Sequence, residues 1–285
     1  MTEDERSRAR AALAAMDAWP VGTAAGVVVR ASGGTVDHGD IDRRFALASL
    51  TKVLTAVAVL VAVEEETVAL DAPAGPPGAT VRHLLAHASG LAPDEAVPLA
   101  PPGKRRIYSN AGFETLADAV AAAAAMPFDE YLRAAVLEPL HLTGTRLEGS
   151  PASGATGTVA DLGRLLAELQ APTILAPATL AEATTTAFPG LDGVLPGFGR
   201  RSPNDWGLGV EVRGRKSPHW TAPGGSPRTY GHFGRAGGFV WVDPDAGVAA
   251  GCLTDRDFGT WATEAWPGFN QGVLDAFDVT PPAGR

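Results

Sequence analysis

The sequence predicts an α+β fold, with an antiparallel β-sheet flanked by helices and a mostly helical subdomain. Strand-like segments lie near both ends of the chain, and a long block of helical patterns lies between them. Strands segregated from helices in this way are typical of α+β proteins, and here the terminal segments are expected to share one sheet. We expect a single domain of residues 1–285, with a sheet subdomain of about 1–48 and 206–285 and a helical subdomain of about 67–190.

A helix and a hairpin are predicted at the N-terminus. Residues 4–18 show the apolar spacing of an amphipathic helix, and residues 24–31 form an apolar segment typical of a strand. Residues 36–40 are expected to pair with that strand after a Ser-Gly-Gly turn. An almost wholly apolar helix is then predicted from Ser49 to about Glu66, a pattern typical of a helix buried in a core.

Further helices are predicted for the middle of the chain. A connector rich in proline and glycine, residues 71–78, precedes a short helix at 81–88, which we expect to end with Gly90 as its C-cap. Apolar periodicity predicts the next helices at 112–125, 128–137, 159–169 and 176–185. The segment 191–205 is rich in glycine and proline and is predicted to be a surface loop, long enough to form a lid or a site wall.

Strand patterns return towards the C-terminus, at residues 206–212, 238–242 and 247–253. A turn is expected at 243–247, because its Asp-Pro-Asp-Ala-Gly sequence is built from residues that favour turns. Residues 261–277 are predicted to form a final helix that Pro267 kinks or interrupts.

Composition and charge limit the class of protein. With 45 % hydrophobic and 19 % charged residues, the chain resembles an ordinary soluble globular protein. The net charge of −9 and the short basic run at 104–106 argue against nucleic acid or an anionic membrane as a partner. The N-terminus has no secretory signal pattern, and the apolar run 53–63 is too short to span a bilayer. We therefore expect a cytoplasmic protein.

Cysteine and histidine patterns do not predict a metal site. The single cysteine, Cys252, excludes an internal disulfide and a zinc site built from several cysteines, and we expect it to be a small buried residue. His83 and His87 have a spacing that can bind metal, but no glutamate lies between them and a structural role is favoured. The other histidines without a partner pattern are expected to be surface or packing residues: His38, His141 and His219.

Ser49 and Lys52 form a Ser-x-x-Lys motif at the head of the apolar helix. Residues three apart share one face of a helix, so the lysine can lie beneath the serine hydroxyl. A serine hydroxyl becomes a good nucleophile only when a base takes its proton, and a lysine can be that base only when burial lowers its pKa. The alternative is a capping serine beside a snorkelling lysine, which the motif alone does not exclude.

Two further motifs follow in the chain. Tyr108-Ser-Asn110 places a phenol that can carry a proton to a leaving group beside Asn110, for which the alternative role is the N-cap of the following helix. His232-Phe-Gly234 lies in a glycine-rich segment that is predicted to come immediately before a strand. Glycine allows the backbone to approach a ligand, so an N–H group there can face that of Ser49 and hold an oxyanion.

These three motifs, in this order, resemble those of the serine β-lactamase-like hydrolases. That group includes class C β-lactamases, D-alanyl-D-alanine carboxypeptidases, D-aminopeptidases and related esterases. The resemblance covers most of the chain, including residues 45–52, 81–91, 108–110, 138–145 and 231–238. It implies a β-lactamase/transpeptidase-like fold with the site in a cleft between the sheet and the helical subdomain. The tryptophans that are candidates to line this cleft are Trp206, Trp220 and Trp241.

The resemblance also implies roles for residues. Ser49 would be the acylated nucleophile, Lys52 its proton acceptor, and Tyr108 the partner base and leaving-group acid. Asn110 would bond to Lys52 and to substrate. In the third motif, the residues expected to bind substrate are His232, Gly234 and Arg235, and the oxyanion hole would be the N–H groups of Ser49 and Arg235.

The third motif departs from the pattern of many penicillin-recognising members, which carry lysine where this chain has His232. A permanent cation is thereby replaced by a group that we expect to titrate near neutrality. The sequence therefore predicts a serine hydrolase acting through a Ser49 acyl-enzyme on a small ester, amide or β-lactam, with esterase-like activity favoured and no cofactor or metal required. A catalytically silent ligand-binding or regulatory domain of the same fold is the alternative. The exact substrate and the oligomeric state are left open.

Overall fold

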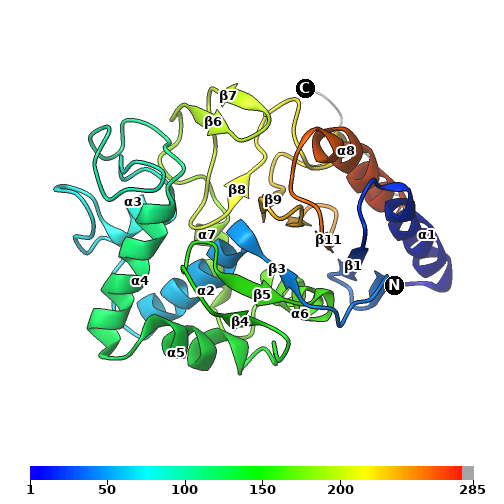
Figure 1. Ribbon diagram of the computed structural model, residues 1–285, viewed down its shortest axis with the longest axis horizontal. Coiled ribbons are helices and arrows are strands. Elements are labelled where there is room, and N and C mark those ends of the chain that lie inside the picture. Colours follow the sequence, from blue (N-terminus) through cyan, green and yellow to red (C-terminus); the bar gives the residue numbers. More distant parts are fainter. Residues whose placement is uncertain (278–285) are drawn as a thin grey trace.

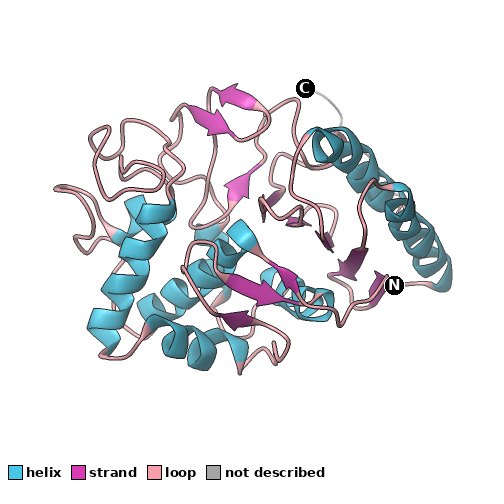
Figure 2. Ribbon diagram, in the orientation of Figure 1, coloured by secondary structure: helices cyan, strands magenta, loops and turns pink. Residues whose placement is uncertain are grey.

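The terminal segments of the chain meet in one antiparallel sheet. In the computed structural model, which describes residues 1–277, the strand order of this six-stranded sheet is β2-β1-β11-β10-β9-β8 (Figures 1 and 2). Its strands are β1 (Ala24–Arg30), β2 (Thr35–His38), β8 (Glu211–Val212), β9 (Tyr230–Phe233), β10 (Phe239–Asp243) and β11 (Val248–Thr254). The α+β prediction is confirmed. Of the predicted sheet subdomain, residues 278–285 lie outside the described residues.

Alternation along the strands gives the sheet two apolar faces. In β1, Val27 and Val29 belong to one buried cluster and Val28 to the other, because successive side chains of a strand point to opposite faces. Helices α1 (Glu3–Ala14) and α8 (Thr260–Asp275) lie side by side over one face, and α6 (Val159–Gln170) packs on the other (Figure 1). The sheet is thus covered on both sides.

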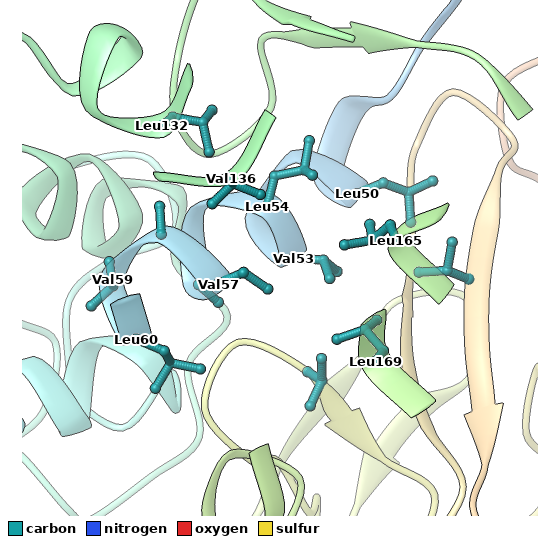
Figure 3. Packing of buried hydrophobic residues seen from close by; sticks show 14 of the residues in the cluster. Leu50, Val53, Leu54, Val57, Val59, Leu60, Leu132, Val136, Leu165 and Leu169 are labelled. Carbon is teal, nitrogen blue, oxygen red and sulfur yellow. The ribbon is translucent and has the colours of Figure 1, made fainter. Parts of the chain in front are cut away.

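Helix α2 (Thr51–Glu64) carries the apolar run through the larger cluster. Every residue from Thr51 to Ala62 is buried, so this helix has no solvent-facing side. Figure 3 shows its leucines and valines among side chains of other segments, including Val136, Leu165 and Leu169. Full burial of a leucine or valine side chain contributes about 1.5–3 kcal/mol, so α2 is strongly held in place. None of the described helices is long and apolar enough to cross a membrane.

The remaining elements surround α2 and close the ends of the sheet. The helices and helical turns are η1 (Ala15–Ala18), η2 (Ala48–Leu50), α3 (Val81–Leu85), α4 (Asn110–Ala124), α5 (Phe128–Leu132), η3 (Arg133–Leu137) and α7 (Pro177–Ala183). A small three-stranded sheet consists of β3 (Phe45–Ala46), β5 (Ala155–Gly157) and β4 (Arg146–Leu147). A separate hairpin pairs β6 (Gly193–Leu195) with β7 (Gly199–Arg201). The division into a sheet subdomain and a helical subdomain stays a proposal.

Three sequence predictions need correction. The segment 191–205 is not a plain loop, because β6 and β7 form a hairpin within it. The strand predicted at 206–212 shrinks to Glu211–Val212, since Trp206 makes only an isolated bridge to Glu211. Strand β9, which contains His232, was not predicted.

The short helix before the site also ends earlier than predicted. Helix α3 ends at Leu85, so Gly90 is not its C-cap. Gly90 adopts a φ of +85°, and a Cβ there would lie 1.9 Å from the carbonyl oxygen of Ala100. Glycine is therefore required at this position for a close contact between two stretches of loop.

Arg106 joins the helical region to the segment that leads into β8. Its buried guanidinium donates to the carbonyl oxygens of Ala86 at 2.5 Å, Ala187 at 2.8 Å and Asn204 at 3.1 Å. From the sequence it was part of a basic run, but the structure uses it as an internal hydrogen-bond donor.

We expect Arg106→Ala to lower the free energy of unfolding by about 3 kcal/mol or more, because three carbonyl groups, those of Ala86, Ala187 and Asn204, lose a charged donor. Urea unfolding followed by circular dichroism measures this value. Arg105→Ala, which removes an exposed arginine next in the chain, is the matched control and should change stability by less than about 0.5 kcal/mol. Equal effects of the two substitutions would contradict the assignment.

Candidate active site

Ser49 lies in the single helical turn η2 that leads into α2. The residue before it, Ala48, has a φ of +45°, a conformation that costs free energy for a residue with a Cβ. Contacts on both sides hold this backbone: the N–H of Leu47 donates to the carbonyl oxygen of Ala155 at 2.9 Å, and the N–H of Ala155 donates to Thr51 Oγ1 at 3.0 Å. The serine is therefore fixed between the helix and strand β5.

Lys52 lies one helical turn beyond the serine and has no exposed surface. Its Nζ donates to Asn110 Oδ1 at 2.6 Å and to the carbonyl oxygen of Ala152 at 2.9 Å. Burial lowers the pKa of this amine to about 7, against the opposing effect of Asp94 and Glu114. At neutral pH a large fraction of the amine is therefore uncharged.

Tyr108 covers the lysine. Lys52 Nζ lies 4.7 Å from the centroid of the phenol ring. Burial raises the pKa of the phenol well above its ordinary value, although the adjacent Ser49 hydroxyl acts in the opposite direction. The phenol oxygen is buried and makes no hydrogen bond of ordinary geometry within residues 1–277. The tyrosine is thus a protonated phenol beside the serine.

Asn110 links the lysine to a surface carboxylate. Ser109 caps α4, because its Oγ accepts from the N–H of Gly112 at 2.9 Å. Asn110 is then the first residue of the helix rather than its N-cap, so the alternative role considered for it is wrong. Its side chain is free to accept from Lys52 and to donate through Nδ2 to Asp94 Oδ1 at 2.7 Å.

The third motif approaches the backbone of Ser49. Gly234 follows strand β9, and a Cβ on this residue would lie 2.7 Å from the carbonyl oxygen of Leu47 and 3.4 Å from the N atom of Ser49. Only glycine fits there without a shift of backbone. The next residue, Arg235, lines the pocket, while its side chain is 88 % exposed and lies 3.8 Å from Asp257.

His232 lies on β9, a strand that was not predicted, and the segment 231–238 leads into β10 as expected. Its ring is buried, and Nδ1 donates to the carbonyl oxygen of Phe233 at 2.7 Å. Burial, together with the charge of Lys52, lowers the pKa of the imidazole to about 4. The expectation that this group titrates near neutrality is therefore wrong, because the ring is uncharged throughout the neutral range.

A pocket of about 290 Å³ brings these residues together. Its lining residues are Ser49, Tyr108, Asn110, Leu195, Pro196, Trp206, Glu211, His232, Phe233, Arg235 and Phe258. Lys52 lies beneath this lining, bonded to Asn110. Leu195 and Pro196 belong to the segment 191–205, for which a site wall was one of the expected roles, and Trp206 was a candidate for the cleft. Phe233 and Phe258 were not predicted as lining residues, and the other two tryptophan candidates, Trp220 and Trp241, are core residues.

Buried polar atoms without partners gather around this pocket. Within the described part of the chain, Tyr108 Oη, Trp206 Nε1, His232 Nε2 and His87 Nε2 make no hydrogen bond. The rings of Tyr108 and Trp206 lie 5.8 Å and 5.4 Å, centroid to centroid, from that of His232. Because such atoms are costly to bury unpaired, they are typical of functional sites.

A buried ionic cluster lies at one wall of the pocket. Glu211 Oε1 lies 2.7 Å from Lys216 Nζ and 3.0 Å from His219 Nε2, and Trp220 Nε1 donates to Oε2 at 2.6 Å. Burial opposes ionisation, but Lys216 and His219 outweigh it and lower the pKa of the carboxyl group. His219 is therefore not a residue without a partner. Sequence spacing could not reveal this cluster, because it joins Glu211 of β8 to residues of the following loop.

The two histidines with metal-like spacing have structural contacts. His87 is buried against Tyr108, with ring centroids 4.5 Å apart, and its Nδ1 accepts from the N–H of Ser109 at 3.1 Å. His83 stacks on Phe188 at 4.3 Å. Cys252 is buried, as predicted. No group of three or more potential metal ligands occurs among residues 1–277.

A comparison of the sequence with models of known protein families identifies the family of this protein. A family model described as β-lactamase matches residues 6–270. The chain belongs to the β-lactamase family. This confirms the resemblance to serine β-lactamase-like hydrolases, and membership supports a hydrolase without fixing its substrate.

Solved structures agree with the β-lactamase family assignment. A crystal structure described as a β-lactamase from Mycobacterium bovis is 53 % identical, with 94 % of this chain and 100 % of that chain covered and a TM-score of 0.92. Simvastatin synthase from Aspergillus terreus is 16 % identical over 96 % of this chain and 98 % of that one, with a TM-score of 0.76. A hydrolase described as having promiscuous acyltransferase activity, EstCE1, is 18 % identical, covers 96 % and 98 %, and has a TM-score of 0.72. No protein of curated function matches the chain.

The lowered pKa of Lys52 predicts how stability depends on pH. Between about pH 7 and 10.5 the unfolded lysine binds a proton that the folded lysine does not, so stability rises with pH through this window. We expect Lys52→Met to remove this rise, so that the variant gains about 2 kcal/mol relative to wild type as the pH falls from 9 to 7. Urea unfolding at both pH values measures the difference.

Lys104→Met, at an exposed lysine, is the matched control. Its free energy of unfolding should change between the two pH values as that of the wild type does. If Lys52→Met shows the same pH dependence as the wild type, the buried amine has an ordinary pKa and the assignment fails.

Proposed function

We propose that this protein is a serine hydrolase that forms an acyl-enzyme at Ser49 and acts on small esters. The single observation that supports this most is the environment of Lys52, whose amine is buried and donates to two oxygen atoms. A neutral amine has two hydrogens and one lone pair. Since both hydrogens are used by Asn110 and Ala152, the lone pair remains available to accept a proton.

In the proposed first step, Ser49 Oγ attacks the ester carbonyl while its proton passes to Lys52 Nζ. The carbonyl oxygen becomes an oxyanion, which we propose is held by the N–H groups of Ser49 and Arg235. The close approach of Gly234, the residue before Arg235, to the N atom of Ser49 supports this pair of donors. The bond to the leaving alkoxide then breaks. Tyr108 gives its proton to that alkoxide and regains one from Lys52.

In the second step, water attacks the acyl-enzyme. Lys52, again neutral, takes the proton of the water, directly or through the phenol of Tyr108, and the proton returns to Ser49 Oγ when the acid is released. The raised pKa of Tyr108 favours a role as acid and relay over a role as a free phenolate base. No cofactor is required by this scheme.

Esters are proposed ahead of β-lactams because of the third motif. Where penicillin-recognising members carry lysine, this chain has the uncharged ring of His232. The name of the Mycobacterium bovis relative supports β-lactam turnover, and that of EstCE1 supports a broader hydrolase. A penicillin is therefore included among the test compounds.

We expect Ser49→Ala to abolish hydrolysis of 4-nitrophenyl acetate while the far-ultraviolet circular dichroism spectrum stays unchanged. Intact-mass spectrometry after brief exposure to the ester, to a D-alanyl peptide and to benzylpenicillin identifies the acyl group retained by the wild type. Ser109→Ala, at a buried serine that caps α4, is the control and should keep the ability to be acylated. Unchanged turnover in Ser49→Ala would contradict Ser49 as the nucleophile. No hydrolysis and no adduct on the wild type with all three compounds would support the catalytically silent alternative.

The pH dependence of the reaction tests the base. We expect kcat/KM for the acetate ester to rise with pH through an apparent pKa near 7, because Lys52 must lose its proton, and to stay level above that to about pH 9. An inflection near pH 4 would instead indicate His232, and an inflection above the ordinary pKa of a phenol would indicate Tyr108, whose pKa burial raises. Either result contradicts lysine as the base.

A further inference from the structure

The two permanent charges that line the catalytic pocket differ in their exposure to solvent. Among the described residues that line it, permanent charges are carried by Glu211 and Arg235. The Arg235 side chain is 88 % exposed beside Asp257, so its guanidinium is in solvent. Glu211 is buried, and its oxygen atoms are already paired with Lys216 and Trp220. The lining therefore offers no buried cation to an anionic substrate.

His232 adds an acceptor to this wall. Its Nδ1 lies 2.7 Å from the carbonyl oxygen of Phe233, and because a carbonyl oxygen only accepts, Nδ1 carries the hydrogen. Nε2 of the neutral ring is then a bare acceptor, and it is buried without a partner in residues 1–277. A second proton on the ring is opposed by burial and by Lys52, whose effects exceed that of Glu211 in the other direction.

Trp206 adds a donor beside this acceptor. The two rings lie 5.4 Å apart, centroid to centroid, and the indole Nε1 also has no partner within the described residues. A hydroxyl or carboxamide can donate to His232 Nε2 and accept from Trp206 Nε1. A carboxylate has no hydrogen to donate, so it would lose its hydration and face the lone pair of the imidazole.

We propose that the pocket selects uncharged substrates and that His232, by offering an acceptor instead of a cation, is the residue that sets this selection. The inference rests on the proposed acyl-enzyme function and names the substrate class of the same site. The selection acts on groups held inside the pocket, near the reacting carbonyl. It gives a physical reason for a preference for neutral esters over substrates that carry a carboxylate.

The test compares two esters of equal size. The mono-4-nitrophenyl ester of adipic acid carries a terminal carboxylate, and its terminal amide carries a neutral carboxamide. We expect kcat/KM of the wild type, corrected for spontaneous hydrolysis, to be about tenfold or more higher for the amide. In His232→Lys the ratio should fall towards one or reverse, whereas His232→Gln, which stays neutral, should keep the preference for the amide.

His38→Lys is the matched control, because it makes the same substitution at the far edge of the sheet, where a lysine can still pair with Asp17. It should keep the wild-type ratio. Equal or faster turnover of the carboxylate ester by the wild type overturns the inference alone, and this result does not depend on whether His232→Lys folds. If neither ester is hydrolysed and Ser49 is not acylated, the proposed function fails and the inference fails with it.

Discussion

The site depends on keeping one amine out of water. Lys52 is buried in the first turn of α2, and its two hydrogen-bond acceptors, Asn110 and Ala152, come from different parts of the chain. Burial that lowers the pKa of the amine also lowers the stability of the fold. The amine therefore stays buried only if helix α2 is held firmly in the core. The apolar residues of α2 supply this, because the helix is buried on all sides from Thr51 to Ala62.

The sheet and the helices contribute different parts of the geometry. Strand β9 leads into Gly234, which approaches the backbone of Ser49, while α4 presents Asn110 to the amine of Lys52. Two apolar clusters hold the strands from both faces. Arg106 ties the loops between these parts through their carbonyl groups. Elements far apart in sequence are thus fixed relative to one another before any substrate binds.

The sequence predicts much of this, for identifiable physical reasons. Periodicity located the strands β1, β10 and β11 and the long helices, since each has a regular apolar pattern. The Ser-x-x-Lys and Tyr-x-Asn motifs identified four site residues from the sequence: Ser49, Lys52, Tyr108 and Asn110. The structure brings these four side chains together. The hairpin at 193–201, the cluster around Glu211 and the protonation state of His232 were not found. The hairpin and the cluster depend on contacts between segments, and the protonation state depends on the local dielectric. None of these produces a recognisable pattern in the sequence.

The unpaired polar atoms around the pocket have a consequence for the evolution of the protein. Tyr108, Trp206 and His232 each keep a buried donor or acceptor without a partner within the described residues, and such atoms are costly to bury unpaired. Apolar replacements of similar shape would remove this cost and favour the fold. Under selection for folding alone, these polar side chains would therefore be expected to disappear over time.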